Sequence, residues 1–120
     1  MSEYREIIID HYKNPRNQGE IENADRVIDE VNSSCGDIIK IFVKLDDGKI
    51  LDMKWQGIGC AISTAGASML SEKVVGMNKS DLEIFGEDGV VEMLGGEINA
   101  GRMKCATLAY RGLLRVFEQE

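Results

Sequence analysis

Two segments of alternating residues joined by a tight turn constrain this fold most strongly. In residues 39–45 every second residue is Ile, Val or Leu, and in residues 51–55 every second residue is Leu, Met or Trp. This period of two is typical of β-strands with one buried face. Between the segments lies Asp46-Asp47-Gly48, which tolerates the positive φ angles of a hairpin turn. We therefore predict an antiparallel hairpin, and the looser alternation from Arg26 to Ser33 predicts a third strand.

Apolar residues at helical spacing predict helices on both sides of these strands. The expected helices are residues 3–13, a segment from near Cys60 to Val74, a short segment from Ser80, and a last segment from about Met103 through Phe117. Ser80 and Glu83 fit a capping box, so the third helix should begin at Ser80 and end around Gly86 or Gly89, with one more turn at 90–94. This order predicts an α+β fold: an N-terminal helix, a three-stranded antiparallel sheet, then C-terminal helices packed on the sheet.

Size and charge limit the classes of function. The chain has 120 residues, 43% of them hydrophobic, so we expect one domain over residues 1–120. The formal net charge of -7 repels a phosphate backbone, so nucleic acid is not an expected partner. No apolar stretch approaches the ~20 residues of a membrane span, and the N-terminus does not resemble a signal peptide. We therefore expect a cytoplasmic protein that does not bind membranes.

The three cysteines point to thiolate chemistry through their positions. A single free cysteine is most often a small buried hydrophobic residue. Here, however, Cys35 follows the first predicted strand, Cys60 stands at a glycine-led helix start, and Cys105 falls in the first turn of the last helix. A helix N-terminus favours the ionised thiol, and Lys104 should favour it further at Cys105. Metal binding or sulfur transfer requires such thiolates.

Asp37 adds a hard oxygen ligand to this set. It follows Cys35 with only Gly36 between them, so one turn could present both side chains to the same ion. Spacing alone favours a metal site only slightly, because the chain has no Cys-x-x-Cys pair. The single histidine, His11, lies within the first predicted helix, where we interpret it as a surface or capping residue rather than a ligand. A Cys/His catalytic dyad ranks below metal binding.

Four motifs carry a resemblance to a known family. They are Asp10-His11-Tyr12-Lys13-Asn14-Pro15-Arg16-Asn17, Cys35-Gly36-Asp37, Gly57-Ile58-Gly59-Cys60-Ala61-Ile62-Ser63 and Lys104-Cys105-Ala106-Thr107-Leu108-Ala109-Tyr110. With them the chain resembles the IscU/SufU/NifU N-terminal family of iron–sulfur scaffold proteins over nearly its whole length. The resemblance implies a SufE/NifU-like fold and assigns the ligand roles to Cys35, Asp37, Cys60 and Cys105. These residues would hold a [2Fe-2S] cluster during assembly, or zinc in its absence.

The same resemblance implies partners. Sulfur would arrive as persulfide from a cysteine desulfurase of the IscS, NifS or SufS type, and finished clusters would pass to apo iron–sulfur acceptor proteins. A [4Fe-4S] cluster bridging a dimer is the alternative form of the product. We expect Cys105 to accept sulfur first, with Cys35 as the alternative. Asp37, a hard ligand among soft thiolates, would be the weak bond at which release begins.

Two departures keep a second function open. Lys104 replaces the histidine that precedes the third cysteine in IscU proteins, as in SufU-like proteins, so the fourth ligand is Asp37, water or a partner's thiolate. Residues 99–103 replace the Leu-Pro-Pro-Val-Lys segment that an Hsp70-type chaperone grips, so the resemblance does not support that partner. The SufU insertion between the second and third cysteines is absent. The alternatives are a zinc-dependent sulfurtransferase of the SufU kind and an interaction module with structural zinc.

Overall fold

A computed structural model describes residues 2–34 and 36–118, with the side chains of the first helix from Arg5 onward. Cys35 lies outside the described residues. The elements in chain order are α1 (Ser2–Lys13), β1 (Arg26–Asn32), β2 (Asp37–Asp46), β3 (Lys49–Ile58), α2 (Ala61–Lys73), α3 (Lys79–Met93), the 3-10 helix η1 (Ala100–Arg102), α4 (Met103–Ala106) and α5 (Leu108–Val116). The predicted α+β class and element order are confirmed.

The described strands form one antiparallel sheet in the order β1-β2-β3. The predicted hairpin joins β2 to β3, and Asp47 and Gly48 at its tip have φ angles of 53° and 78°, as a two-residue turn of this kind requires. A β-bulge near Leu45 shifts the register of the hairpin. The alternation with Met53 predicts that Leu51 lies on the buried face. Because of the bulge, the side chain of Leu51 is instead 56% exposed.

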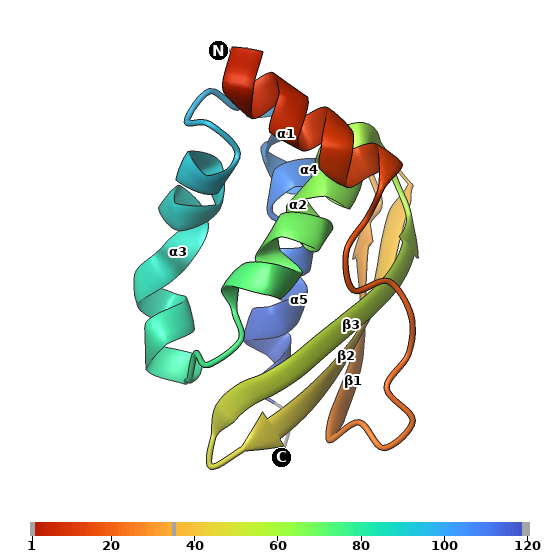
Figure 1. Cartoon of the computed structure of the whole chain (residues 1–120), viewed down its shortest axis with the longest axis vertical. Coiled ribbons are helices and arrows are strands. Elements are labelled where there is room, and N and C mark those ends of the chain that lie inside the picture. Colours follow the sequence, from red (N-terminus) through yellow and green to blue (C-terminus); the bar gives the residue numbers. More distant parts are fainter. Residues whose placement is uncertain (1, 35, 119–120) are drawn as a thin grey trace.

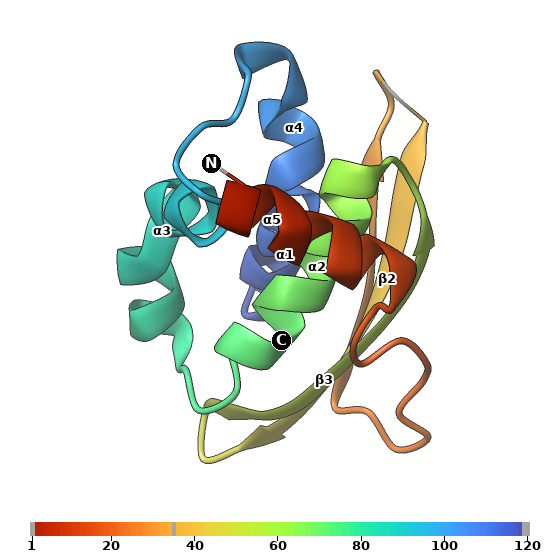
Figure 2. The same ribbon diagram turned by 45° about the horizontal axis from the view of Figure 1, so that its top comes forward.

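Helices cover one face of the sheet in a second layer (Figure 1). Helix α2 contacts β3, α5 contacts β1 and β2, and the two helices contact each other. Helix α1 lies across α2, and α3 packs against α5 on the outside (Figure 2). The largest fully buried side chains at this contact include Ile41, Met53, Trp55, Leu70 and Leu113. The core therefore lies between the sheet and the α2/α5 pair.

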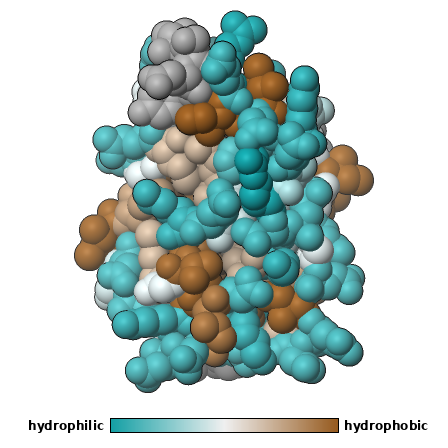
Figure 3. Space-filling model, viewed as in Figure 1, coloured by the Kyte–Doolittle hydropathy of each residue, from teal (hydrophilic) through white to brown (hydrophobic). Residues whose placement is uncertain are grey.

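Figure 3 shows the face of the molecule on which α1, α2 and α3 lie, and this surface is mostly hydrophilic with separate hydrophobic patches. Ile7 and Ile9 of α1 contribute to the exposed apolar residues, at 40% and 41% exposure. None of the described helices is long and apolar enough to cross a membrane.

The prediction of a surface position for His11 is wrong. Its side chain is buried where α1 crosses α2, and Nδ1 lies 2.6 Å from Oγ of Ser68. The same hydroxyl accepts a bond from the backbone N–H of Arg16 (2.8 Å), whose carbonyl accepts the indole N–H of Trp55 (2.8 Å). His11 therefore belongs to a polar network that fastens α1 and the segment after it to the core.

Local corrections apply to the later helices. The capping box of α3 is formed by Asn78 and Asp81 rather than by Ser80, so the helix starts at Lys79. Gly86 interrupts the helix with φ 65°, as predicted, but the chain resumes helical geometry and continues to Met93. The last predicted helix is divided at Thr107 into α4 and α5.

His11 should make the stability of the protein fall on mild acidification. Burial, assisted by the charge of Arg16, lowers the pKa of His11, while Glu72 and Asp10 oppose this shift. The unfolded chain therefore binds this proton first as the pH falls through the ordinary value of about 6.5, and folding loses free energy below it. The melting temperature should drop between pH 7.5 and 5.5, and the drop should be smaller for His11→Asn. Equal drops in both proteins would contradict this role.

Candidate metal centre

Three of the four predicted ligands meet at one end of the molecule. Asp37 begins β2, Cys60 is the N-cap of α2, and Cys105 lies in α4. One donor atom from each of these three residues lies within 4.8 Å of the other two. Figure 2 shows the end of β1, the start of α2 and α4 near one another at this end. Cys35, the fourth predicted ligand, lies outside the described residues, in the loop between β1 and β2.

Glycines allow the close approach of these segments. Gly59, between β3 and Cys60, has no room for a side chain: a Cβ there would overlap Oγ of Ser63 and lie 3.1 Å from Oδ1 of Asp37. Gly36 has φ +75°, a conformation that L side chains rarely adopt. The backbone at Gly59, directly before Cys60, can therefore lie close to the Asp37 carboxyl group.

Asp37 contributes a buried carboxyl group to the site. The residue is 3% exposed, and among the described residues its Oδ2 has no hydrogen-bond partner. A buried polar oxygen without a partner costs free energy, and a carboxylate is stabilised there by a cation or a further donor. The nearby thiols of Cys60 and Cys105 complete a donor set of the kind that holds zinc or iron–sulfur clusters. The described donors therefore fit such a group.

Cys60 has the more accessible thiol of the two described cysteines. Burial alone would raise the pKa of Cys60, but hydrogen bonds from the backbone and side chain of Ser63, the thiol of Cys105 and the backbone of Ile62 leave that pKa lowered. These backbone donors belong to the first turn of α2, where N–H groups lack helical partners. Cys60 is therefore predisposed to the thiolate form.

Cys105 is buried at 1% exposure, and Asn32 contacts its sulfur. The Nδ2 of Asn32 donates to Sγ of Cys105 at 3.7 Å, and the Oδ1 accepts from the backbone N–H of Ser34 at 3.3 Å. Our sequence reasoning missed Asn32. The signal that could have identified Asn32 is its position in the strand. It lies four positions after the buried Ile28 and two after Glu30, so these side chains share the inward face of β1.

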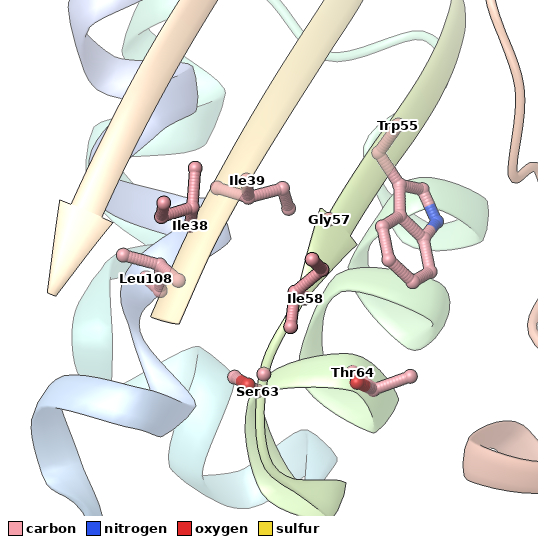
Figure 4. A pocket seen from close by; sticks show the side chains of 9 residues that line it. Ile38, Ile39, Trp55, Gly57, Ile58, Ser63, Thr64 and Leu108 are labelled. Carbon is pink, nitrogen blue, oxygen red and sulfur yellow. The ribbon is translucent and has the colours of Figure 1, made fainter. Parts of the chain in front are cut away.

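The rim beside the site is apolar. A crevice of about 10 Å³, room for about one water, lies between the strand ends and the start of α2, lined in part by Ile38, Ile58, Ser63 and Thr64 (Figure 4). Val31, Ile38 and Ile58 are cross-strand neighbours, and all are exposed, Ile58 at 81%. The site therefore borders a hydrophobic edge of the outer sheet face.

Comparison with known proteins gives close similarities over most of the chain. Residues 3–118 match the family model of the NifU-like N terminal domain. The chain is 39% identical over 112 residues to the iron–sulfur cluster assembly scaffold protein IscU 1 of Archaeoglobus fulgidus, which covers 93% of this chain and 72% of the relative. It is 38% identical over 129 residues to the zinc-dependent sulfurtransferase SufU of Bacillus subtilis. This alignment covers 92% of this chain and 86% of the relative.

A solved structure agrees with these similarities. A protein from Fervidobacterium islandicum, with a proposed role as iron–sulfur cluster assembly scaffold for the SUF system, superposes with a TM-score of 0.81 at 28% identity, over 92% of this chain and 93% of that protein. The alignment with the Bacillus protein spans 129 positions, more than the 120 residues of this chain. That relative therefore has residues without a counterpart in this chain.

Zinc should stabilise the reduced protein if this site binds metal. Binding only to the folded state at a free concentration of 100 times Kd adds about 2.7 kcal/mol to the free energy of unfolding, and the melting temperature should rise accordingly. Cys60→Ser and Cys105→Ser should lose most of this rise, because serine replaces a thiolate poorly. Asp29→Asn, which changes an exposed carboxylate on β1, is the control and should respond like the wild type. An equal response in the cysteine variants would exclude the site.

Proposed function

We propose that this chain, which belongs to the family of NifU-like N-terminal domains, is a scaffold on which iron–sulfur clusters are assembled and from which they are transferred to acceptor apoproteins. The observation that carries the proposal is the buried Asp37 carboxyl group beside two thiols, with an Oδ2 that has no hydrogen-bond partner among the described residues. Relatives named as IscU scaffold proteins, including one 39% identical, support the same function.

The ligand set we propose is Cys35, Asp37, Cys60 and Cys105, and the cluster is its cargo. Cys35 joins the set because its loop begins at Asn32, which contacts Cys105, and ends at Asp37. Three soft thiolates suit iron and sulfide, while one hard carboxylate is the ligand that an incoming thiolate displaces most readily. A [2Fe-2S] cluster is the proposed product, and zinc can occupy the same donors when iron is absent.

Exchange with other proteins is part of this proposal. A cysteine desulfurase would deliver sulfur, and apo iron–sulfur proteins would accept the cluster. The half-buried Cys60 supports such exchange, because a partner can approach its sulfur while Asp37 and Cys105 stay covered. The segment in place of the Hsp70-binding motif forms η1, capped by a bond from the backbone N–H of Gly101 to Oδ1 of Asn99 (2.7 Å), and gives no support to that chaperone as a partner.

A zinc-dependent sulfurtransferase is the second candidate. The 38% identity with Bacillus SufU supports it, as does Lys104, which occupies the SufU-like position before Cys105. In this alternative the same donors hold zinc permanently and one cysteine carries sulfur as a persulfide. The two functions differ in whether the site releases a cluster.

Anaerobic reconstitution with ferrous iron, cysteine, a desulfurase and a thiol reductant, which reduces persulfide sulfur to sulfide, tests the choice. The scaffold should develop the visible absorption and Mössbauer spectrum of an iron–sulfur cluster, and the cluster should pass to an apo-ferredoxin. A protein that retains zinc, forms no cluster and still speeds desulfurase turnover would instead be a sulfurtransferase. A protein that does neither would leave a structural zinc module as its role.

Asp37→Ala tests whether the carboxylate permits release. Its loss removes the ligand that an incoming thiolate displaces most readily, so the bound cluster should persist longer and its transfer should slow. Cluster half-life and the rate of transfer to apo-ferredoxin, both measured anaerobically, should therefore change in opposite directions. Asp29→Asn serves again as the control. Faster cluster loss from Asp37→Ala would make Asp37 an ordinary ligand and contradict the labilising role.

We propose Cys105 as the first sulfur acceptor, with Cys35 as the alternative. Because Cys105 is 1% exposed, transfer to it requires the desulfurase to open the site first. Mass spectrometry after brief exposure to desulfurase and cysteine should locate the first persulfide on Cys105. A first label on Cys60, the more exposed thiol, would show that sulfur enters without such opening and would contradict the assignment.

A further inference from the structure

The helix that carries Cys105 is too short to hold its own position. Helix α4 has four residues, Met103–Ala106, and Thr107 separates it from α5 with φ -100° and ψ 8°. A single turn is unstable in isolation, since one or two hydrogen bonds do not offset the entropy of ordering it. The place of Cys105 in the site therefore depends on contacts from outside α4.

Arg111 supplies such contacts from the first turn of α5. Its Nη2 donates to the carbonyl oxygen of Lys104, the residue before Cys105, at 3.1 Å. Its Nη1 donates to Oγ1 of Thr107 at 3.2 Å, and that hydroxyl donates in turn to the carbonyl oxygen of Met103 at 2.8 Å. One guanidinium group thus bonds to α4 and to the break that follows it.

Strand β1 holds the other side of the same group. Nε of Arg111 lies 4.0 Å from Oε2 of Glu30, whose side chain is only 14% exposed. Two residues further along the strand, Asn32 donates to Sγ of Cys105. Glu30 and Asn32 are both directed toward the helices, because side chains two apart in a strand share a face. Cys105 is therefore held twice by β1, through its sulfur and through the backbone of its helix.

We propose that Arg111 is a positioning residue that fastens α4 to β1 and so keeps Cys105 in the ligand site. The proposal rests on the assignment of Cys105 as a ligand in the proposed function. Asn32 also accepts a hydrogen bond from the backbone N–H of Ser34, in the segment that leads to Asp37. Displacement of α4 from β1 would therefore separate Cys105 from Asn32 and from this segment. The clamp formed by Arg111, Glu30 and Asn32 therefore sets how readily Cys105 leaves the site.

A purely stabilising role is the alternative, and Arg115 provides the matched control. One turn after Arg111, Arg115 also pairs with Glu30, at 2.6 Å from Oε1, and donates to the carbonyl oxygen of Asp29 at 3.0 Å. These bonds tie α5 to β1 and do not reach α4. Arg111→Met and Arg115→Met each remove one arginine from Glu30 and keep a good helix former. Only the first removes the bonds to α4.

Alkylation of the metal-free, reduced chain by iodoacetamide, followed at each cysteine by mass spectrometry, tests the clamp. In Arg111→Met the rate at Cys105 relative to Cys60 should rise about five- to tenfold, since two or more hydrogen bonds that restrain α4 are lost. In Arg115→Met the ratio should stay within about twofold of wild type, because the bonds of Arg115 go to β1 and not to α4. Equal ratios in the two variants would overturn the proposal.

Arg111→Lys provides a second variant in case Arg111→Met does not fold. An ammonium group cannot engage two acceptors with the fixed fork of a guanidinium, so the Cys105 ratio should still rise, by less than in Arg111→Met. An unchanged ratio in a folded Arg111→Lys protein would refute the clamp.

The alkylation measurement needs no metal or cluster. A chain that shows the change in ratio but binds neither zinc nor a cluster would therefore disprove the proposed function while the clamp stands. In a chain that binds zinc, release to a chelator should be faster from Arg111→Met than from Arg115→Met, and equal release rates would refute the clamp.

Discussion

The packing of α2 and α5 against the inner face of the sheet is the contact on which the rest of the structure depends. Ile41 and Leu113 are fully buried in this contact and Trp55 almost fully, and burial of such side chains is the main favourable contribution to folding. The contact fixes the start of α2 beside the first residue of β2. Cys60 and Asp37 therefore meet because the core is packed, and the site derives its geometry from apolar residues that take no part in its chemistry.

The site combines a firmly packed frame with candidate ligands that differ in burial. Asp37 is buried with an oxygen that lacks a described partner, and Cys105 is covered, whereas Cys60 is partly open. A closed structural zinc site would satisfy its donors equally on all sides. The unequal burial here supports the proposed exchange of a cluster with other proteins. In the proposed clamp, the short α4 makes the position of Cys105 depend on Arg111, whereas a longer helix would hold its own position.

Much of this arrangement could be predicted because its causes are local. The hairpin follows from Asp47 and Gly48, and Cys60 at the start of a helix follows from the glycines before it. Errors arose where distant contacts decide. His11 was interpreted as a surface residue because the direction in which α1 crosses α2 has no signature in its own segment. Leu51 was grouped with the buried alternation because the bulge in β3 depends on the pairing with β2.

The family, the element order and the three described candidate ligands could be identified from the sequence alone, because periodicity, turn chemistry and motifs are properties of neighbouring residues. The side chains that surround these candidate ligands could be identified only from the folded structure. Asn32 and Cys105 are 73 positions apart, and Arg111 and Glu30 likewise lie on elements far apart in the sequence. Nothing in either segment specifies the other, since each contact forms only when the packed core has fixed the distance and orientation between β1 and the C-terminal helices.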